Sequence, residues 1–479
     1  MRRALLIAGP CVALSIVVAC ASPADVTLGQ LADAGETTAV VPTEVDASSD
    51  PPRDAGSLPV RSACSDAGWC ATELPDDDLD VRDIWPLEGR AFAIAESLSL
   101  GVKTLEWDPS NGWRYIDDNT QNAYGSGVYA GTLWAPNENE IHYGVAPGFI
   151  YHGTRKDPSS PWSWERSRLE DHGQGGPELD HGRVEYRKWS NGKPSKSAAI
   201  GVWARAEDDV YAWYANTIFR RQVDGSGQAS WGVEHVVEDA TTPNEALYVL
   251  SASGSGPEDM WFSGARARYI DGRTHVCPVV LHKTADGYRR VVDHDINQVN
   301  QPNGACTAKS GHNHFSRLFY FAPLDTTFVI PIDVGGYIPR IESSGPNVAV
   351  GMHDFYLVYM RDEGEWSGVT NTVRFDGAYG TFDVHAAFSS IWINGEDAWI
   401  GGWGAVLKTN TDHQRWKNGE AIASDYQLKT DQLDAGRYEV SSIALNGAAL
   451  DVPFHQVRGT SNTNIWAVGQ RYALHKTTP

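Results

Sequence analysis

A short pattern recurs along this chain and constrains its fold more than any other feature. An acidic or polar residue is followed two positions later by an aromatic residue, then by small or apolar residues, a turn and an apolar strand. The clearest copies begin at Asn464 and Asp397. The central residues of the seven copies are Phe92, His142, Tyr211, Trp261, Phe328, Trp399 and Trp466. Repetition at this period predicts a repeat architecture.

Each copy lies in a unit of about four short strands, which we call a, b, c and d. The pattern itself begins strand b. An apolar residue followed by tryptophan recurs upstream, in strand a, at Trp85, Trp134, Trp203 and Trp392. A turn and a further aromatic residue recur downstream, at Trp113, Tyr288 and Trp366. Four-stranded units in series are typical of a β-propeller. We therefore predict an all-β, seven-bladed β-propeller over residues 63–479, with an open solenoid as the alternative.

The two ends of this region favour a closed ring. Pro479 directly follows strand c of the last unit, so that unit lacks its own strand d. The segment from Trp69 to Leu74 looks like an isolated strand d near the N-terminus. Pairing the N- and C-terminal strands would complete the last blade and hide edge strands that otherwise promote aggregation.

The repeat resembles that of lipid-anchored bacterial propellers, whose blades read roughly D-x-W-A-V-G, then G-x-I-x-H-x-D-G, then W. The run from Trp466 to Gly469 matches this pattern well, whereas the copies at His142 and Phe92 depart from it. The resemblance covers residues 64–479. It implies a fold and a location, and little about activity, because few members of this group have assigned activities.

The N-terminal segment predicts export and lipidation. Arg2 and Arg3 precede an apolar run that is short for a membrane span, as in a signal peptide over residues 1–19. The run ends Val-Val-Ala-Cys at Cys20, which resembles the lipobox of bacterial lipoproteins; an ordinary secretory signal is the alternative. The resemblance implies lipidation of Cys20 and attachment to the membrane. Ala21 stands in place of the Asp that often retains lipoproteins in the inner membrane, which favours the outer membrane. We therefore expect a lipid-anchored protein of the outer membrane or of the cell surface or periplasm.

Residues 20–62 lack aromatic residues and periodicity, so we expect a flexible tether. The formal net charge of the chain is −22, which argues against a nucleic-acid partner. Besides Cys11 and Cys20, four cysteines remain for an oxidising compartment, and they allow three pairings. We favour Cys64–Cys70, beside the closing strand, and Cys277–Cys306, expected in two loops at one end of the fourth unit.

No catalytic fingerprint occurs, and we expect no cofactor unless a divalent metal binds. His312 and His314 form an H-x-H pair downstream of an Asp-His-Asp run at 293–295, and with a carboxylate they suit zinc or a similar ion. Hydrogen-bonded loop histidines are the alternative. The acidic a–b turns, the central tryptophans and the strand-c histidines His152, His282 and His475 recur in register, which favours a structural role.

The longest interruptions of the repeat are mostly d–a connections, around 165–200, 293–318 and 417–455. They all fall at one end of the strands, and insertions on a single face often mark a binding face. The aromatic residues in or beside these segments have two alternative roles: to stack on a ligand, or to pack the loops against the blades. They are Trp162, Trp164, Tyr186 and Trp189. We predict a cell-envelope module that binds a protein or a glycan through this long-loop face. The alternative is an extracytoplasmic hydrolase or lyase with its site at the mouth of the channel.

Overall fold

The computed structural model describes residues 64–123, 129–187, 194–297, 305–309, 315–321, 326–332, 336–353, 356–363, 365–372, 389–402, 404, 406–410, 438–441, 443, 445, 450 and 452–478. All of them belong to one structural unit, residues 61–479. Their only helical segment is the short 3₁₀-helix η1 (Thr120–Asn122). Within these ranges no helix is long and apolar enough to cross a membrane. The protein is an all-β protein.

The strands form sheets of four or more strands, which we number 1 to 7, and one two-stranded sheet, β10-β11. Strand pairing in these sheets is antiparallel except between β21 and β26 of sheet 5. Sheet 1 contains β2 (Asp80–Leu87), β3 (Arg90–Ser97), β4 (Gly101–Asp108) and β5 (Gly112–Tyr115). Sheet 2 contains β6 (Ala130–Asn137), β7 (Glu140–Val145), β8 (Phe149–Thr154) and β9 (Ser163–Arg168). The two-stranded sheet follows, with β10 (Arg183–Arg187) and β11 (Pro194–Ala198). Sheet 3 contains β12 (Ile200–Ala204), β13 (Val210–Tyr214), β14 (Thr217–Val223) and β15 (Ala229–Val236).

The later sheets carry additions to the four-stranded pattern. Sheet 4 contains β16 (Ala246–Gly256), β17 (Asp259–Ile270), β18 (Arg273–Thr284), β19 (Gly287–Asn297) and β20 (Ala305–Ala308). Sheet 5 contains β23 (Arg340–Ser343), β24 (Val348–His353), β25 (Tyr356–Glu363) and β26 (Glu365–Thr372), extended by β21 (Phe315–Phe321) and β22 (Thr326–Ile332). Sheet 6 contains β27 (Ser390–Asn394), β28 (Asp397–Gly401), β29 (Val406–Asn410) and β30 (Tyr438–Ser441). Sheet 7 contains β31 (Phe454–Ser461), β32 (Asn464–Gly469), β33 (Tyr472–Lys476) and β1 (Trp69–Thr72).

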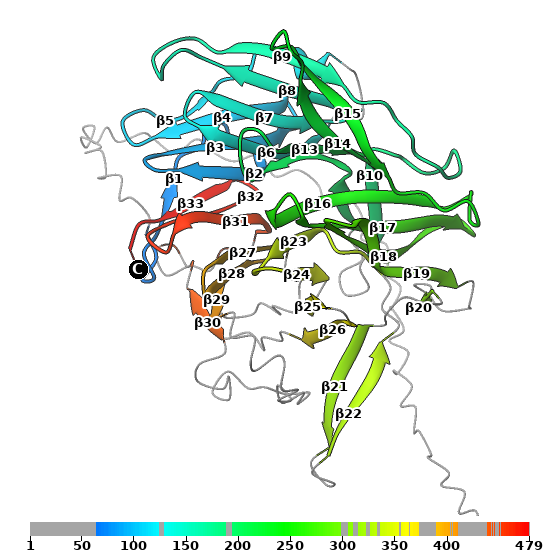
Figure 1. Cartoon of the computed structure of the whole chain (residues 1–479). Helices are drawn as coiled ribbons and strands as arrows, with labels where there is room; N and C mark the ends of the chain where they lie inside the picture. The colour runs from blue at the N-terminus through cyan, green and yellow to red at the C-terminus, as the bar shows by residue number, and fades with distance from the viewer. Residues whose placement is uncertain are drawn as a thin grey trace, which may run out of the picture. The chain divides into compact units, whose positions relative to one another are not determined.

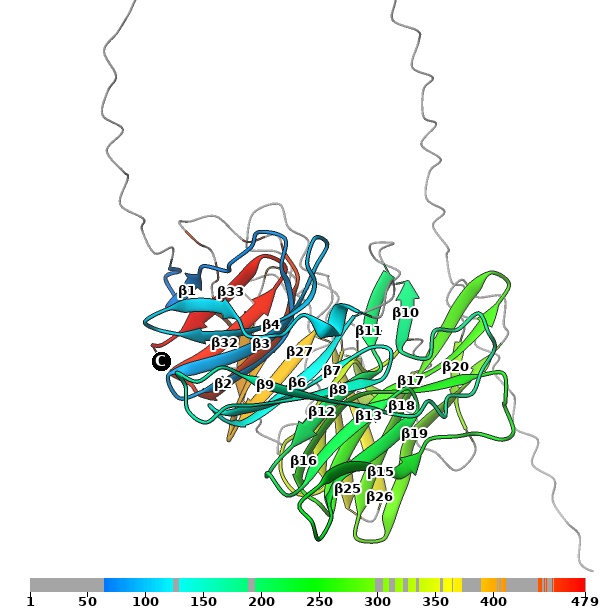
Figure 2. The same cartoon turned by 90° about the horizontal axis from the view of Figure 1, so that it is seen from above.

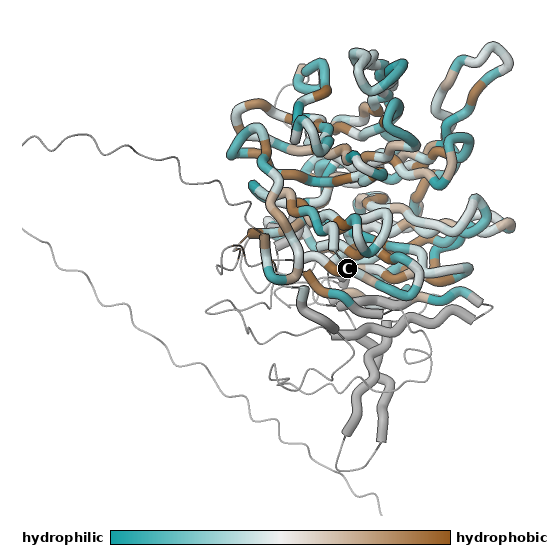
Figure 3. The backbone as a smooth tube through the Cα atoms, turned by 90° about the vertical axis from the view of Figure 1, so that its left-hand side faces the viewer, coloured by the Kyte–Doolittle hydropathy of each residue, from teal (hydrophilic) through white to brown (hydrophobic). Residues whose placement is uncertain are grey.

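Tight turns explain the glycine that precedes many outer-strand aromatics. Gly112 opens β5 and Gly287 opens β19, and both have positive φ values, 67° and 103°. Residues with a Cβ rarely adopt this conformation, so glycine allows the chain to reverse at these points. Figure 3 shows hydrophobic residues along the strands and hydrophilic residues on many of the turns.

The core lies between consecutive sheets. One buried cluster combines Ile84 and Ala93 of sheet 1 with Trp466 and Val468 of sheet 7, and similar clusters join sheets 1 and 2, 2 and 3, 3 and 4, 4 and 5, and 6 and 7. The first strands also contact one another in chain order, β2 with β6, β6 with β12, β12 with β16, β16 with β23, β23 with β27 and β27 with β31, and β31 contacts β2 (Figure 1). Sheets that pack face to face around their first strands define a β-propeller.

The N-terminal strand joins the sheet that contains the C-terminal strand. β1 pairs antiparallel with β33, with Trp69 opposite Lys476 and Thr72 opposite Ala473 (Figure 2). A disulfide between Cys64 and Cys70 lies at the start of β1. The second disulfide joins Cys277 in β18 to Cys306 in β20. Cys277 therefore lies within a long hairpin strand and not in a loop as the sequence suggested.

The fifth copy of the repeat was placed wrongly. Phe328 belongs to β22, which pairs with β21, and β21 in turn pairs parallel with β26 at the outer edge of sheet 5. The second strand of sheet 5 is β24, in which Val350 pairs with Glu342 of the first strand. β24 lacks the acidic–x–aromatic pattern, whereas the segment around Phe328 resembles it, so the pattern predicts the second strand of sheet 5 at the wrong place. The six other central residues all lie on the second strand of their sheet.

Candidate functional site at one end of the first strands

One position recurs on the first strand of every sheet. It is the residue that pairs across strands with the central residue of the repeat, as Trp85 pairs with Phe92 and Trp134 with His142. In sheet 5, which lacks a copy of the repeat on its second strand, the equivalent residue pairs with Val350. In sheets 1 to 7 this position holds Trp85, Trp134, Trp203, Ser253, Glu342, Trp392 and Arg458. Since the first strands contact one another in series, these side chains converge although they lie far apart in the sequence.

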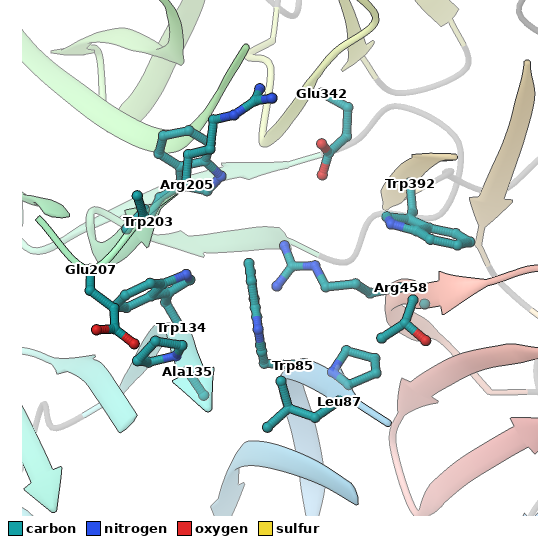
Figure 4. Close-up of a pocket in the computed structure, with 16 residues that line it drawn as sticks. Trp85, Leu87, Trp134, Ala135, Trp203, Arg205, Glu207, Glu342, Trp392 and Arg458 are labelled. Carbon is teal, nitrogen blue, oxygen red and sulfur yellow. The ribbon is translucent and has the colours of Figure 1, made fainter. Parts of the chain in front are cut away.

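Six of these seven residues line one cavity of about 460 Å³ (Figure 4). The cavity lies where the first strands end and the a–b turns begin, since its walls also contain Leu87, Pro136 and Thr460. Adjacent antiparallel strands alternate in direction, so this end is opposite to the d–a connections, which include β10 and β11. The structure therefore places a cavity at the end opposite to the long-loop face.

Four tryptophans dominate the cavity wall. Trp134 and Trp392 are largely buried, 3% and 9% exposed, and are held by neighbouring side chains. Trp85 and Trp203 are only half-buried, so part of each residue remains exposed. The guanidinium of Arg458 lies over the ring of Trp85, 4.6 Å from its centroid, which fixes the arginine by a cation–π contact.

A carboxyl group lies among these aromatic rings. Ser253 Oγ donates a hydrogen bond to Glu342 Oε2 at 3.0 Å. Burial raises the pKa of Glu342 to about 7, against the opposing effects of the Arg458 charge and the Ser253 hydrogen bond. Arg458 itself donates to the carbonyl oxygen of Ile84 at 3.1 Å and lies 3.5 Å from Asp83. The cavity thus offers a carboxyl group that changes charge near neutral pH, beside a fixed guanidinium.

The same register explains the repeat itself. In several sheets, the third-strand residue that pairs with the central residue also contacts a polar side chain of the second strand. This polar residue lies two positions before the central residue. In sheet 7, His475 Nε2 lies 2.9 Å from Asn464 Oδ1, and its ring stacks on Trp466 at 4.1 Å. In sheet 4, His282 Nε2 lies 2.8 Å from Asp259 Oδ1 and stacks on Trp261.

Other sheets vary this polar–aromatic–basic triad. Sheet 6 uses Lys408 with Asp397, at 3.5 Å, over Trp399. Sheet 3 uses Arg220 with Asp209, at 2.8 Å, against Tyr211. The polar residue and the central residue are two positions apart on the second strand, so their side chains lie on the same face of the sheet. The third-strand residue that pairs with the central residue lies on this face too, so the three side chains meet. The histidines and acidic residues of the repeat therefore stabilise the sheets, as the sequence indicated.

The structure describes some of the remaining predicted site residues and leaves others outside the described ranges. The lipidation site Cys20 and the metal candidates His312 and His314 lie outside the described residues, as does Trp189. The run at 293–295 is partly structural, because Asp293 and His294 are buried and Asp293 accepts hydrogen bonds from Arg266.

The aromatic residues after β8 pack against the blades. Trp162 and Trp164 join the cluster between sheets 1 and 2, and Trp164 Nε1 donates to the carbonyl oxygen of Ile116 at 3.0 Å. The residues that sequence analysis did not recognise as a site are Glu342, Arg458 and the four strand-a tryptophans. The recurrence of the strand-a tryptophans is visible in the sequence, but the sequence alone does not show which residues of the other sheets lie beside them.

Two solved structures are distantly similar to this chain. No family model matches the sequence, and no curated protein matches it. The structure titled "YCF48 bound to D1 peptide" is similar with a TM-score of 0.44 and 11% identity, over 86% of this chain and 97% of that chain. A Penicillium chrysogenum alpha-L-arabinanase complexed with arabinobiose is similar with a TM-score of 0.30 and 10% identity, over 60% and 91%. The assignment of a β-propeller rests on the strand pairing and sheet packing above.

Proposed function

We propose that this chain is a lipid-anchored protein of the cell envelope whose closed, seven-bladed β-propeller binds a neutral glycan at the tryptophan-lined cavity. The anchor rests on the lipobox resemblance at Cys20. The blade count and the closure are supported by the cyclic order of contacts among the first strands and by the pairing of β1 with β33. The two disulfides are in keeping with an oxidising compartment outside the cytoplasm.

The single observation that carries the ligand class is the composition of the cavity. A sugar ring presents an apolar C–H face and a rim of hydroxyl groups, and it therefore needs flat apolar surface beside hydrogen-bonding groups. Trp85 and Trp203 supply partly exposed aromatic residues to the lining, and Glu342 and Arg458 supply a carboxyl group and a guanidinium in the same cavity. Its volume, about 460 Å³, is within the ordinary range for small-molecule sites.

The charges of the lining favour a neutral glycan. Two acidic residues, Glu207 and Glu342, and two arginines, Arg205 and Arg458, line the cavity, so neither sign of charge is in large excess. The chain as a whole is strongly acidic, which disfavours polyanionic ligands. The sequence led us to expect a protein or a glycan bound through the long-loop face, and such binding is an alternative outcome of the test.

The test is a glycan array followed by affinity measurements on the strongest neutral oligosaccharide. Trp85→Ala and Trp203→Ala should each weaken binding about tenfold, which corresponds to ~1.4 kcal/mol of lost aromatic contact. The matched control is Trp231→Ala, which removes a half-buried tryptophan from the outer strand β15 that does not line the cavity. This control should bind like the wild type.

A second control examines the opposite face. The exposed pair of Glu185 on β10 and Lys196 on β11 lies in a d–a connection, and replacing both residues by alanine should leave glycan binding unchanged. Loss of binding in this double variant, with normal binding in the tryptophan variants, would move the site to the long-loop face.

A hydrolase remains the second candidate because Glu342 combines a raised pKa with a position in the cavity. A glycoside hydrolase needs such a protonated carboxyl group as its general acid. Release of reducing ends from the bound oligosaccharide by the wild type, and its loss in Glu342→Gln with binding retained, would favour the enzyme over the binding module.

A further inference from the structure

Sheet 2 has a histidine as the central residue of the repeat, where most sheets have a larger aromatic side chain. The central residue is His142, while sheets 4, 6 and 7 have tryptophan there. The third-strand residue opposite it is His152, and the polar residue two positions before it is Glu140. This one difference turns a triad with one imidazole into a group of two imidazoles and a carboxylate.

The three donor groups converge on one point. His142 Nε2 lies 3.1 Å and His152 Nε2 lies 3.0 Å from the same oxygen, Glu140 Oε1. The two imidazole rings are stacked with centroids 4.2 Å apart and planes 4° apart, so both Nε2 atoms point the same way. One donor atom from each residue lies within 4.8 Å of the others.

These distances suit a shared metal ion. Zinc binds histidine nitrogen and carboxylate oxygen at about 2.0–2.2 Å, which leaves the donors of one coordination shell roughly 3–3.5 Å apart. Two imidazoles and one carboxylate are a donor set for zinc and for other borderline divalent transition metals. Three protein ligands leave a position for water or for a further ligand.

The surroundings allow an ion to enter. The side chains of Glu140 and His152 are 26% and 22% exposed, while His142 is 1% exposed and is fixed by the strand. His142 Nδ1 has no hydrogen-bond partner among the described residues, so Nε2 is the polar contact of this ring. The charge of Arg221 also acts on His142 and opposes a cation there.

We propose that Glu140, His142 and His152 form a binding site for a divalent transition-metal ion, with zinc as the preferred occupant. The site lies directly behind the cavity, because His142 pairs across strands with Trp134, whose ring lies 5.6 Å away. An ion here would lock the rotamers of both histidines and support Trp134 in the cavity wall. The proposal does not depend on the glycan.

The repeat supplies the variants that test the site. His142→Trp installs the residue that sheets 4, 6 and 7 use at this position, and His152→Lys installs the residue that sheet 6 uses opposite its tryptophan. Each variant removes one nitrogen donor while keeping a side chain that the architecture accepts. His475→Gln removes the corresponding third-strand histidine of sheet 7, where no second imidazole is present, and is the matched control.

The experiment is a calorimetric titration of the full-length chain, purified without a histidine tag and treated with a chelator, with Zn²⁺. The wild type and His475→Gln should bind one Zn²⁺ per chain, and both sheet-2 variants should lose this binding. Zinc should raise the midpoint of thermal unfolding in the same two proteins, and unfolding without metal shows whether each variant folds. No binding by the wild type, or unchanged binding in a folded His142→Trp or His152→Lys variant, would overturn the proposal and leave the triad purely structural.

Discussion

Trp69 on β1 donates its indole N–H to Ser441 Oγ on β30, at 2.8 Å, and so ties the N-terminal strand to the neighbouring sheet 6. Its side chain is fully buried, and its ring meets that of Trp399 edge-on at 6.2 Å. The N-terminal strand thus contributes to two sheets, by backbone pairing with β33 and by this side chain.

Replacing Trp69 by alanine should therefore destabilise the whole protein. Truncation of a buried tryptophan typically costs ~3–5 kcal/mol of the free energy of unfolding, and Trp69→Phe should cost less because most of the packing stays. Denaturant unfolding measures both values. If Trp69→Ala lowers stability no more than the outer-strand control Trp231→Ala, then β1 does not hold the ends of the chain together.

The second prediction concerns the buried charges of sheet 4. Arg266 is fully buried and contacts Asp239 at 3.0 Å, Glu245 at 2.8 Å and Asp293 at 2.8 Å. Arg266→Met keeps much of the volume but leaves these carboxylates without their shared partner, so it should cost ~3–5 kcal/mol at neutral pH. Unfolding of the variant against the wild type measures the cost.

This difference should depend on pH. Burial disfavours the charge on Asp239, but hydrogen bonds from Lys309 and Thr241 and the charge of Arg266 hold its pKa below the ordinary value. A depressed pKa contributes stability that is complete above the pKa of the unfolded chain, about 4, and is lost as the pH falls further. The gap between wild type and Arg266→Met should be largest above pH ~5 and should shrink in acid. A gap that grows in acid would contradict the network.

Glu342 gives the opposite pH dependence. Its pKa in the folded chain is raised to about 7 by burial, so the folded state resists ionisation that the unfolded chain undergoes near pH 4.5. Wild-type stability should therefore fall between pH ~4.5 and ~7 through this residue. Glu342→Gln should be more stable than the wild type at pH 8, by ~1–3 kcal/mol, and similar to it at pH 4.5. Equal stability at pH 8 would show that Glu342 ionises without cost.

The two disulfides should differ in their contribution. Cys64–Cys70 closes a separation of 6 residues, and Cys277–Cys306 a separation of 29. Loop-closure entropy predicts that removal of the first costs roughly 2 kcal/mol and removal of the second roughly 3.5 kcal/mol. Paired Cys→Ser variants compared by thermal unfolding test this order, and a larger loss for the Cys64–Cys70 pair would assign that bond a role beyond chain entropy.

The sequence predicted the strands better than the site. Trp466 and Trp399 lie on second strands as expected, because alternation and turn residues are local signals. The fifth copy failed at Phe328 because β24 carries no aromatic marker, and an added hairpin imitates the pattern. Glu342 could not have been recognised from the sequence, since its meaning comes from neighbours more than 100 residues away, such as Arg458 and Trp203. Long-range convergence of this kind needs the arrangement of the sheets.

The most direct test of the account is a crystal structure of the chain with the neutral oligosaccharide that it binds most tightly. We predict a sugar ring stacked on Trp85 or Trp203 within the cavity, with its hydroxyl groups hydrogen-bonded to Glu342 or Arg458. A sugar bound at the opposite end, against β10 and β11, with the cavity empty, would contradict it.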